Sequence, residues 1–370
     1  MSRWRSEINI DLYALERNIQ LIRGSILEAD VCAVVKANAY GHGALPIAKK
    51  LCEIGISWFA VSSILEAVDL REGGVNDQNI LIFGSGFLNE LDTIRRYRLT
   101  PVIHSEECLV TVTKNLTSEL KVHLELDTGM GRTGLQQADM ARAIQEVRKN
   151  PYLVIDGVFT HFACADNPQS LFTQNQLELF ENTIEKLANS GISPRYVHAA
   201  NSPGILTTES KFNLVRPGLL MYGVSPYPQN EMLVRPVLTW KTKPCQLKML
   251  PVGESISYGH TWTAKRKTMI AVIPVGYADG YPRIASNKGF VLVGNHKTPI
   301  VGNICMDYMM LDITDCIGVT LDTTITLVGS HGGEEISLND IATWSDTIPY
   351  EVMCNVGKRS KFIFIDGERE

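Results

Sequence analysis

Eight short apolar segments recur along the first 218 residues of the chain, and segments with helical periodicity lie between them. Runs rich in Val and Ile, each followed by a helix, are typical of a parallel sheet that is buried on both faces. Eight such units close most naturally into a (β/α)8 barrel, although a doubly wound sheet shares the pattern. The runs are VCAVVK (31–36), SWFAVSS (57–63), NILIFG (79–84), TPVIHS (100–105), ELKVHLELD (119–127), IDGVFTHF (155–162), RYVHAAN (195–201) and FNLVRPG (212–218).

The segments between these runs predict helices. Residues 44–55 and 169–191 carry apolar side chains at three- and four-residue spacing, and the second segment stops at a glycine. A further helix is predicted over residues 11–24, with Asp11 as its N-cap. Because this helix precedes the first run, we expect it to fill the gap left by the weak helix after the last strand.

The pattern changes near residue 232, where β-branched residues alternate with Gly, Pro and Asn. Such alternation is typical of strands and turns. We therefore predict an α/β organisation in which an N-terminal (β/α)8, TIM-like barrel covers residues 1–232 and a mainly β domain covers residues 233–370.

Composition narrows the class of function. The chain has 370 residues, of which 45% are hydrophobic and 20% charged, with a formal net charge of -5 and no dense Lys/Arg run. These values argue against electrostatic binding to nucleic acid or anionic lipid and favour small molecules. The start, MSRWRSEINI, lacks the apolar core of a signal peptide, and no apolar span fits a bilayer, so we expect a cytoplasmic protein that does not enter a membrane. Eight scattered cysteines without a C-x-x-C pair predict reduced thiols rather than disulfides or a metal site.

Polar residues gather where the predicted strands end, which in a barrel is the face that carries the site. A lone lysine at a strand end would ordinarily extend its amine into solvent. Lys36 is not alone, because other polar residues are predicted at the same ends of the strands. A partly desolvated lysine has a lowered pKa and can form a Schiff base with an aldehyde. Nearby glycines and Ser202 could present N–H and O–H groups to a phosphate. The polar set comprises Lys36, Tyr40, His42, Asp127, Arg132, His161, His198, Asn201, Ser202 and Arg216.

These motifs resemble those of the bacterial alanine racemases, a family of pyridoxal phosphate (PLP) enzymes with a barrel and a C-terminal β domain. The resemblance spans nearly the whole chain and rests on many motifs in one order. They are AVVKANAYGHG, LDTGMGRTG, FTHFA, AANSPG, RPGLLMYG, SYGHTW, VGYADGYPR, ICMDYMMLDI and TIPYEVMCNVGKR.

The resemblance implies a two-base racemisation of L- and D-alanine that supplies D-alanine, a peptidoglycan precursor. Lys36 would hold PLP and serve as base on one face of the α-carbon, because PLP makes the α-proton removable. Tyr258 would act on the opposite face, where His161, His198 and Arg216 would help a phenol with a reference pKa of about 10 to act as a base.

Arg216 discriminates among PLP enzymes. By resemblance it contacts the pyridine nitrogen, and because arginine only donates, that nitrogen stays unprotonated. A less electron-withdrawing ring limits transamination. A barrel-type PLP decarboxylase, the alternative within this chemistry, places a glutamate there instead.

The resemblance also implies the remaining contacts. Arg132 would engage the substrate carboxylate and the phenolic oxygen of PLP, the Met306 N–H would add to the carboxylate, and Asp307 would only position its neighbours. In the family, the Tyr258 and Met306 regions reach the lysine of a second subunit, which implies a homodimer with shared sites. Phosphate and cofactor contacts would fall to Tyr40, His161, Asn201, Ser202, Arg216, Gly218, Leu219 and Tyr350.

Two positions depart from the family pattern. Many members carry a carbamylated lysine where this chain has Glu125, which would itself supply the negative charge that orients Arg132. The family usually has arginine where this chain has Asn303, which leaves open how the substrate enters and whether serine is accepted as well as alanine.

A biosynthetic and a catabolic role both remain open. A non-catalytic PLP-binding protein and a barrel without cofactor are further alternatives; the former resembles the single-barrel PLP homeostasis family, which lacks counterparts of Tyr258 and Tyr350.

Overall fold

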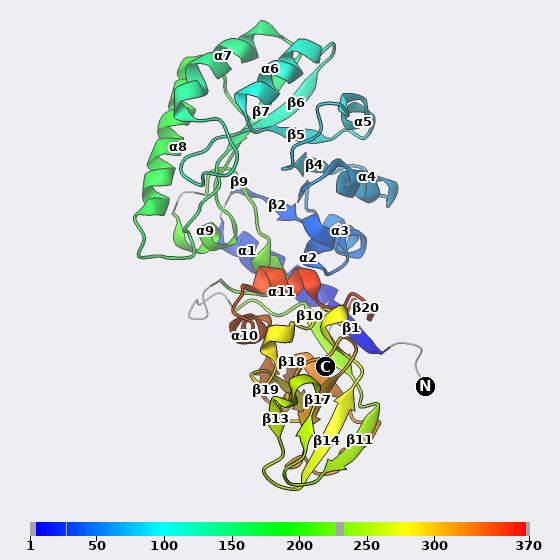
Figure 1. Cartoon of the computed structure of the whole chain (residues 1–370). Helices are drawn as coiled ribbons and strands as arrows, with labels where there is room; N and C mark the ends of the chain where they lie inside the picture. The colour runs from blue at the N-terminus through cyan, green and yellow to red at the C-terminus, as the bar shows by residue number, and fades with distance from the viewer. Residues whose placement is uncertain (1–4, 27, 210, 227–232, 368–370) are drawn as a thin grey trace.

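A computed structural model of the chain describes residues 5–26, 28–209, 211–226 and 233–367. Its N-terminal part is a barrel of eight parallel strands (Figure 1). The strands follow one another in the order β8-β7-β6-β5-β4-β3-β2-β9. A β-bridge between Asn201, which follows β8, and Arg216, which follows β9, joins the two ends of this sheet. Each predicted run overlaps one of the strands, although β2 and β7 begin one and two residues earlier than predicted, so the barrel is confirmed. They are β2 (Asp30–Val34), β3 (Trp58–Val61), β4 (Asn79–Ile82), β5 (Thr100–Ile103), β6 (Leu120–Glu125), β7 (Leu153–Phe159), β8 (Tyr196–His198) and β9 (Leu214–Val215).

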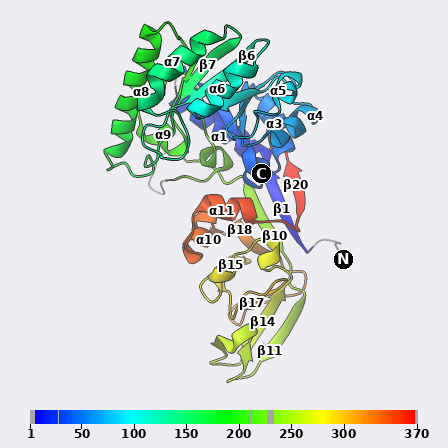
Figure 2. The same cartoon turned by 45° about the horizontal axis from the view of Figure 1, so that its top comes forward.

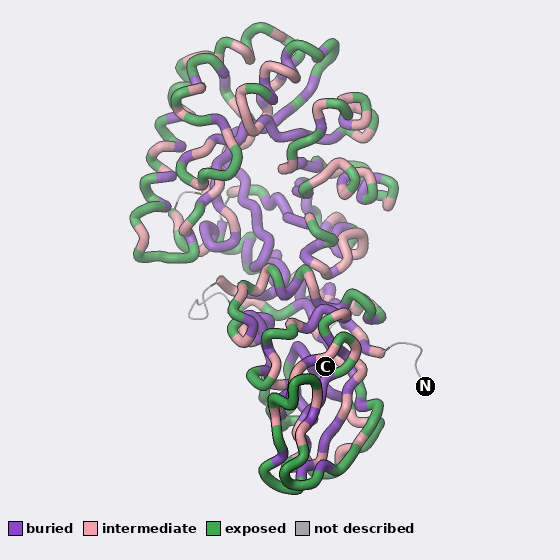
Figure 3. The backbone as a smooth tube through the Cα atoms, in the orientation of Figure 1, coloured by how far each residue is buried: buried purple, intermediate pink, exposed green. Residues whose placement is uncertain are grey.

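Helices cover the outside of the barrel (Figures 1 and 2). All four residues of β3 are buried, as expected for a strand with barrel core on one side and helices on the other. Figure 3 shows that the other barrel strands are mostly buried, although β2, β4 and β6 each contain one exposed residue. The helices are α3 (Ala44–Glu53), α4 (Ile64–Glu72), α5 (Leu91–Arg96), α6 (Glu106–Asn115), α7 (Met140–Lys149), α8 (Phe172–Asn189) and α9 (Ser202–Thr207), with the 3-10 turns η1 (Gln137–Asp139) and η2 (Leu219–Tyr222).

The predicted first helix is α1 (Leu12–Ser25). The N–H of Ala14 donates to Asp11 Oδ1 at 2.8 Å, which confirms Asp11 as the N-cap. The Asn18 amide donates to the carbonyl of Met221 in η2 at 3.2 Å. Because η2 is a single turn that follows β9, α1 occupies the place of the helix that the last unit lacks.

The C-terminal part is mainly β, as predicted, with two short helices. Its largest sheet includes β1 (Ser6–Asp11), which runs antiparallel to β10 and parallel to β20. The chain therefore starts in the sheet of the second domain before it enters the barrel. The predicted boundary at residue 232 falls on segment 227–232, outside the described residues, and it stays a prediction. The elements are β10 (Leu238–Thr242), β11 (Gln246–Leu250), β12 (Ser255–Ile256), η3 (Tyr258–His260), β13 (Trp262–Thr263), β14 (Thr268–Ile273), η4 (Tyr277–Asp279), η5 (Arg283–Ala285), β15 (Phe290–Val293), β16 (His296–Pro299), β17 (Met309–Asp312), β18 (Ile325–His331), β19 (Glu334–Ile336), α10 (Leu338–Trp344), α11 (Pro349–Asn355) and β20 (Lys361–Ile365).

Helix α11 connects the two domains, because it packs against α2 (Lys36–Tyr40), the segment that follows the first barrel strand. A Cβ on Gly41 would meet the carbonyl oxygen of Met353 in α11 at 2.3 Å, so this approach requires a glycine. Among the described helices, none is long and apolar enough to cross a membrane.

An ion-pair network fixes the surface of the β domain near β1. Arg359 donates through Nε and one terminal nitrogen to both carboxylate oxygens of the buried Asp279, at 2.9 and 2.8 Å. Its other terminal nitrogen lies 2.9 Å from Asp307 Oδ1, which also pairs with Arg5 at 3.3 Å. Bidentate pairs of this kind hold both partners in one geometry. Asp307 therefore links segments that are far apart in the sequence, as its predicted positioning role requires, although that role itself stays a prediction.

Arg359→Met should lower the free energy of unfolding by about 2 kcal/mol, because the Asp279 carboxylate loses charge-assisted hydrogen bonds. The loss stays below that of a fully buried pair because the Arg359 side chain is 39% exposed and water can replace it. Urea denaturation followed by circular dichroism measures the change. Arg266→Met is the control, since it breaks an exposed pair with Asp315 and should leave the midpoint nearly unchanged. Equal midpoints for Arg359→Met and the wild-type chain would contradict the prediction.

Candidate active site

The carboxyl ends of the barrel strands bring charged side chains from distant segments together. Lys36, directly after β2, interacts electrostatically with Arg132, Glu66, Cys354 and Arg216. Burial lowers the pKa of the Lys36 amine, and Arg132 lowers it further. A larger fraction of the amine is therefore unprotonated at neutral pH, as a nucleophile or a proton acceptor requires.

The segment that carries Lys36 has an unusual backbone. Ala37, Asn38, Ala39 and Tyr40 have φ angles of 51°, 53°, 55° and 52°, so α2 is a left-handed turn. Residues with a Cβ are destabilised in this region by about 1–2 kcal/mol each. The turn is held from outside: the N–H of Ala44 donates to Asn38 Oδ1 at 2.8 Å, and Gly41 packs closely on α11. Strain of this kind concentrates at functional sites.

A cradle of hydroxyl and N–H groups lies beside this turn. Ser202 Oγ accepts hydrogen bonds from the N–H groups of Gly218, at 2.9 Å, and Leu220, at 3.3 Å. Both acceptor positions of the hydroxyl are thus used, and its O–H remains available as a donor. A Cβ on Gly218 would lie 2.8 Å from the Tyr40 hydroxyl, so glycine is needed there too.

Two tyrosines complete the cradle. The ring centroids of Tyr40 and Tyr350 are 5.9 Å apart. Burial raises the pKa of both, that of Tyr350 to about 12, so both phenols remain donors. Within the described ranges, these two hydroxyls and the N–H groups of Ser202 and Leu219 have no hydrogen-bond partner in the protein. Four free donors around one space suit a phosphate group.

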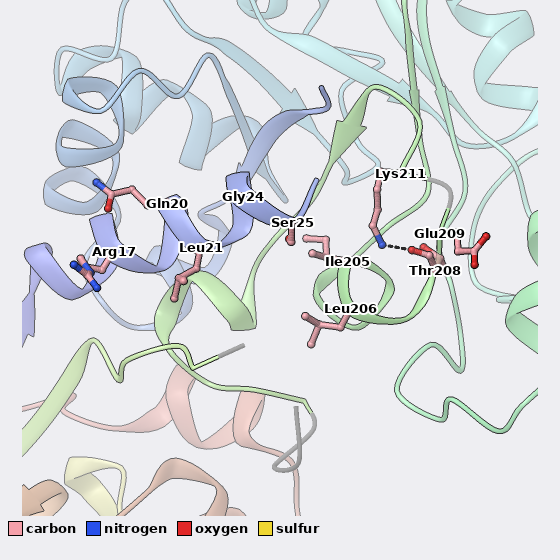
Figure 4. Close-up of a pocket in the computed structure, with 10 residues that line it drawn as sticks. All are labelled: Arg17, Gln20, Leu21, Gly24, Ser25, Ile205, Leu206, Thr208, Glu209 and Lys211. Carbon is pink, nitrogen blue, oxygen red and sulfur yellow. Dashed lines mark hydrogen bonds between the residues drawn. The ribbon is translucent and has the colours of Figure 1, made fainter. Parts of the chain in front are cut away.

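Helix α9 contributes to the cradle and is fixed at both ends. At its start Asn201 Oδ1 accepts the N–H of Gly204 at 3.0 Å, so Asn201 is the N-cap of this helix, and its predicted cofactor contact stays a prediction. Beyond its end, the Lys211 amine donates to the carbonyls of Gly204, at 3.1 Å, and Thr208. Figure 4 shows Lys211 pointing toward Thr208, at the edge of a hollow of about 970 Å³ between α1 and α9. Burial lowers the Lys211 pKa to about 8; its bonds serve the helix terminus, where a cation is favourable.

Arg216 is the centre of the buried polar network. It is 3% exposed, and burial lowers its pKa only to about 10, so it remains charged. One terminal nitrogen donates to His198 Nδ1 at 2.8 Å, and the other donates to the carbonyls of Thr160, at 2.8 Å, and Ala199, at 3.0 Å. His161 Nδ1 lies 3.4 Å from the second nitrogen. Nε–H has no protein partner in the part of the chain that the structure describes.

The direction of these bonds fixes two histidine tautomers. Because Arg216 can only donate, His198 Nδ1 accepts and its Nε2 must carry the proton. His198 Nε2 lies 2.9 Å from His123 Nδ1, which therefore accepts in turn. Burial, and next the charge of Arg216, lowers the pKa of both rings, that of His123 to about 3. Both histidines are accordingly neutral.

Glu125 and Arg132 lie near each other but not in a direct pair. Glu125 is 5% exposed, and burial raises its pKa against opposing effects of a hydrogen bond from Thr133 and the charge of Arg132. In the described ranges no ion pair within 4.0 Å joins the two side chains. The idea that Glu125 orients Arg132 stays a prediction.

The structure separates Tyr258 and Met306 from the barrel mouth. Both residues belong to the β domain, where Tyr258 is 71% exposed and Met306 is 52% exposed. In Figure 1, β13, which follows Tyr258, lies well away from α2. The Tyr258 carbonyl accepts from the Asn303 amide at 2.7 Å, so Asn303 supports the Tyr258 turn. Within one chain, therefore, Lys36 and Tyr258 do not form one site.

Several residues near Lys36 and Arg216 were not predicted from the sequence. His123 is a strand residue without a motif of its own, and only the pairing of β6, β7 and β8 brings it to His198. The aromatic ring of Phe83 lies 6.0 Å from Lys36 Nζ, and the Tyr222 hydroxyl donates to the Val34 carbonyl at 3.0 Å. Cys354 is a lone thiol with no pattern to mark it. Glu66 could have been found from the sequence, because a serine followed three residues later by a glutamate, as Ser63 and Glu66 are, predicts a capping box at a helix start.

Comparisons with known proteins agree with this arrangement. The family model "Alanine racemase, N-terminal domain" matches residues 10–226, and "Alanine racemase, C-terminal domain" matches residues 237–364. The alanine racemase of Symbiobacterium thermophilum is 39% identical over 356 residues, which is 95% of this chain and 94% of that protein. The alanine racemase of Halothermothrix orenii is also 39% identical, over 359 residues, with 95% and 94% covered.

Solved structures give the same result. The alanine racemase of Streptomyces coelicolor superposes with a TM-score of 0.92 at 33% identity and covers 98% of both chains. That of Bacillus anthracis, solved with bound L-Ala-P, superposes with a TM-score of 0.91 at 33% identity and covers 99% of this chain and 96% of its own.

His123→Asn should make stability less sensitive to acid. The folded pKa of His123 is about 3, against about 6.5 in an unfolded chain, so the unfolded state binds more protons below pH 6.5. The free energy of unfolding is therefore full above pH 6.5 and falls as the pH decreases toward 3. Each such group contributes a slope of at most about 1.4 kcal/mol per pH unit. Asparagine keeps an acceptor for His198 but does not titrate, so thermal melts between pH 7 and 4 should show a shallower decline. An unchanged decline would contradict the neutral-histidine chain.

Proposed function

Because the chain belongs to the alanine racemase family, whose members are isomerases that racemise alanine, we propose that it performs this reaction with PLP by a two-base route. The proposal includes a homodimer with shared sites and a cytoplasmic role in supplying D-alanine for peptidoglycan. One observation carries it: a lysine of lowered pKa and a buried arginine with a free Nε–H meet at the mouth of one barrel.

The side chains of the mouth fit PLP. The Lys36 amine would take the aldehyde, and Arg216 Nε–H would donate to the ring nitrogen. The phosphate would be bound by Tyr40, Tyr350 and Ser202 hydroxyls, with the N–H of Leu219 and the Cβ-free space at Gly218. His161 and Asn201, the other predicted cofactor contacts, lie next to each other, with Asn201 Nδ2 3.5 Å from His161 Nε2. When bound, PLP supplies the electron sink that makes the α-proton of the substrate removable.

Lys36 would move the proton on one face of the α-carbon. Its lowered pKa increases the fraction of the amine that is unprotonated and can accept a proton, and the protonated form can return it. Arg132 would hold the substrate carboxylate, and the N–H of Met306 would add a second contact. A carboxylate held in this way fixes the α-carbon relative to the base.

Inversion requires a second group on the opposite face, and we assign that role to Tyr258. Its hydroxyl must come from the partner subunit's Tyr258, because within one chain this residue begins η3, the turn before β13, which Figure 1 shows well away from α2. Its surroundings support an interface, since large apolar side chains are exposed on the same domain. They include Tyr258, Tyr277, Ile284, Met306 and Tyr308.

Arg216 favours racemisation over the alternatives. A guanidinium does not lose its proton under these conditions, so a ring nitrogen that it contacts accepts rather than carries a proton. We expect this to suppress transamination. A decarboxylase of the same architecture would need a carboxylate in this place.

Tyr258→Phe should slow α-proton exchange far more for one alanine enantiomer than for the other. Only one face loses its proton carrier, and a positioned acid–base group contributes about 10²–10⁴-fold. Deuterium incorporation into L- and D-alanine, measured separately by NMR in D2O, reports each face. Tyr277→Phe is the matched control and should exchange both enantiomers at wild-type rates. Equal losses for the two enantiomers in Tyr258→Phe would argue for a single base.

Lys36→Ala and Tyr258→Phe should complement each other when co-expressed. If each site combines Lys36 of one subunit with the partner subunit's Tyr258, a heterodimer of the two variants has one intact and one doubly altered site. Each variant alone should be nearly inactive in racemisation, whereas the mixture should recover about a quarter of wild-type activity for random pairing in a two-site dimer. Optical rotation of alanine measures the recovery. Activity no greater than that of the separate variants would rule out shared sites.

A further inference from the structure

The left-handed turn after Lys36 needs an external support, and Glu66 in α4 supplies it. The Ala37 N–H, the first of the turn, donates to Glu66 Oε1 at 2.7 Å. Ala37 begins the run of four residues with positive φ. A backbone held in this region persists only where its surroundings fix it.

The second carboxylate oxygen of Glu66 binds a different loop. Glu66 Oε2 accepts from the N–H and Oγ of Ser62, at 2.7 and 2.8 Å, and from the N–H of Ser63 at 3.3 Å. Ser63 Oγ accepts the Glu66 N–H at 3.2 Å, which completes a capping box. The capping box uses only Oε2. The bond from Oε1 to Ala37 is therefore additional to what the helix terminus requires.

We propose that Glu66 is a positioning residue for Lys36: its carboxylate ties the loop after β2 to the loop after β3 and so fixes the direction of the Lys36 side chain. This inference rests on the proposed function, because Lys36 is the residue that Glu66 serves. In a barrel mouth assembled from separate loops, such a link adds to the contacts of Asn38 and Gly41, which support the later part of the turn.

Glu66 also shapes the charge around the amine. The groups that act on Lys36 are Arg132 and Arg216, which lower its pKa, and Glu66 and Cys354, which raise it. Among these described groups, Glu66 is the carboxylate. Loss of its charge should lower the Lys36 pKa further, and the acidic limb of the kcat profile should move to lower pH.

The test compares Glu66→Gln with Ser63→Ala. Glutamine has one carbonyl oxygen, so it can serve one loop, while its NH2 group faces the N–H donors of the other. Ser63→Ala removes the side-chain cap of α4 but leaves the Ala37 bond intact. Hydrogen exchange of the peptide around residues 35–43, followed by mass spectrometry on the PLP-loaded protein, reports the turn directly. The pH dependence of kcat reports the charge.

Glu66→Gln should accelerate exchange of this peptide at least tenfold and shift the acidic limb down by about half a pH unit or more. Ser63→Ala should leave the exchange rate and the acidic limb at wild-type values, even if its melting temperature is lower. Wild-type exchange in Glu66→Gln, or the same two changes in Ser63→Ala, would overturn the proposal and reduce Glu66 to a helix cap.

A third variant keeps the test decisive if Glu66→Gln does not fold. Glu66→Asp retains the charge but has a shorter reach, so it should accelerate exchange and leave the acidic limb in place. Wild-type exchange in this variant would count against the tie. Hydrogen exchange does not depend on catalytic activity. If the wild-type chain neither bound PLP nor racemised alanine, the proposed function would be wrong. The hydrogen bond between Ala37 and Glu66 could still be tested by exchange in that case.

Discussion

The closing of the barrel at β9 is the contact on which the site depends. β9 has only two residues, Leu214 and Val215, and pairs with β2 on one side. On the other side, the bridge between Asn201 and Arg216 brings in the segment that follows β8. Lys36 follows β2, and Arg216 follows β9. Residues from the beginning and the end of the barrel sequence thus become neighbours, and α9, with its cradle of hydroxyl and N–H groups, is placed beside both.

A permanent charge in this closed interior sets the state of its surroundings. Arg216 is buried and donor-only, so its neighbours must accept, and backbone carbonyls and His198 do so. Its charge, added to burial, keeps His161, His198 and His123 neutral. With Arg132 nearby, the mouth is positively charged, which favours a ligand that carries phosphate and carboxylate groups.

The sequence predicted what depends on periodicity and missed what depends on long-range pairing. The eight strands and α1 could be read because apolar runs and an N-cap are local signals. The place of β1 in the second domain could not, since a strand does not reveal its partners. The left-handed turn has no composition cue, because Ala37 and Ala39 ordinarily favour right-handed helix. His123 became visible only through its contact with His198. Lys36, Arg216 and Ser202 were found because they lie at the ends of predicted strands, whereas their roles came from the resemblance to a family and stay predictions.

Backbone strain occurs at both proposed bases, and this symmetry supports the two-base reading. Ala37 to Tyr40 follow Lys36 with positive φ, and Ser257 and His260, on either side of Tyr258, have φ of 68° and 48°. A neighbouring side chain fixes each turn: Glu66 binds the Ala37 N–H, and Asn303 binds the Tyr258 carbonyl. Strained turns persist where the surroundings hold them, and such turns concentrate at functional sites. Tyr258 is 71% exposed on a turn whose carbonyl Asn303 binds, so the two-base proposal predicts that its hydroxyl meets the lysine of a second copy of this chain.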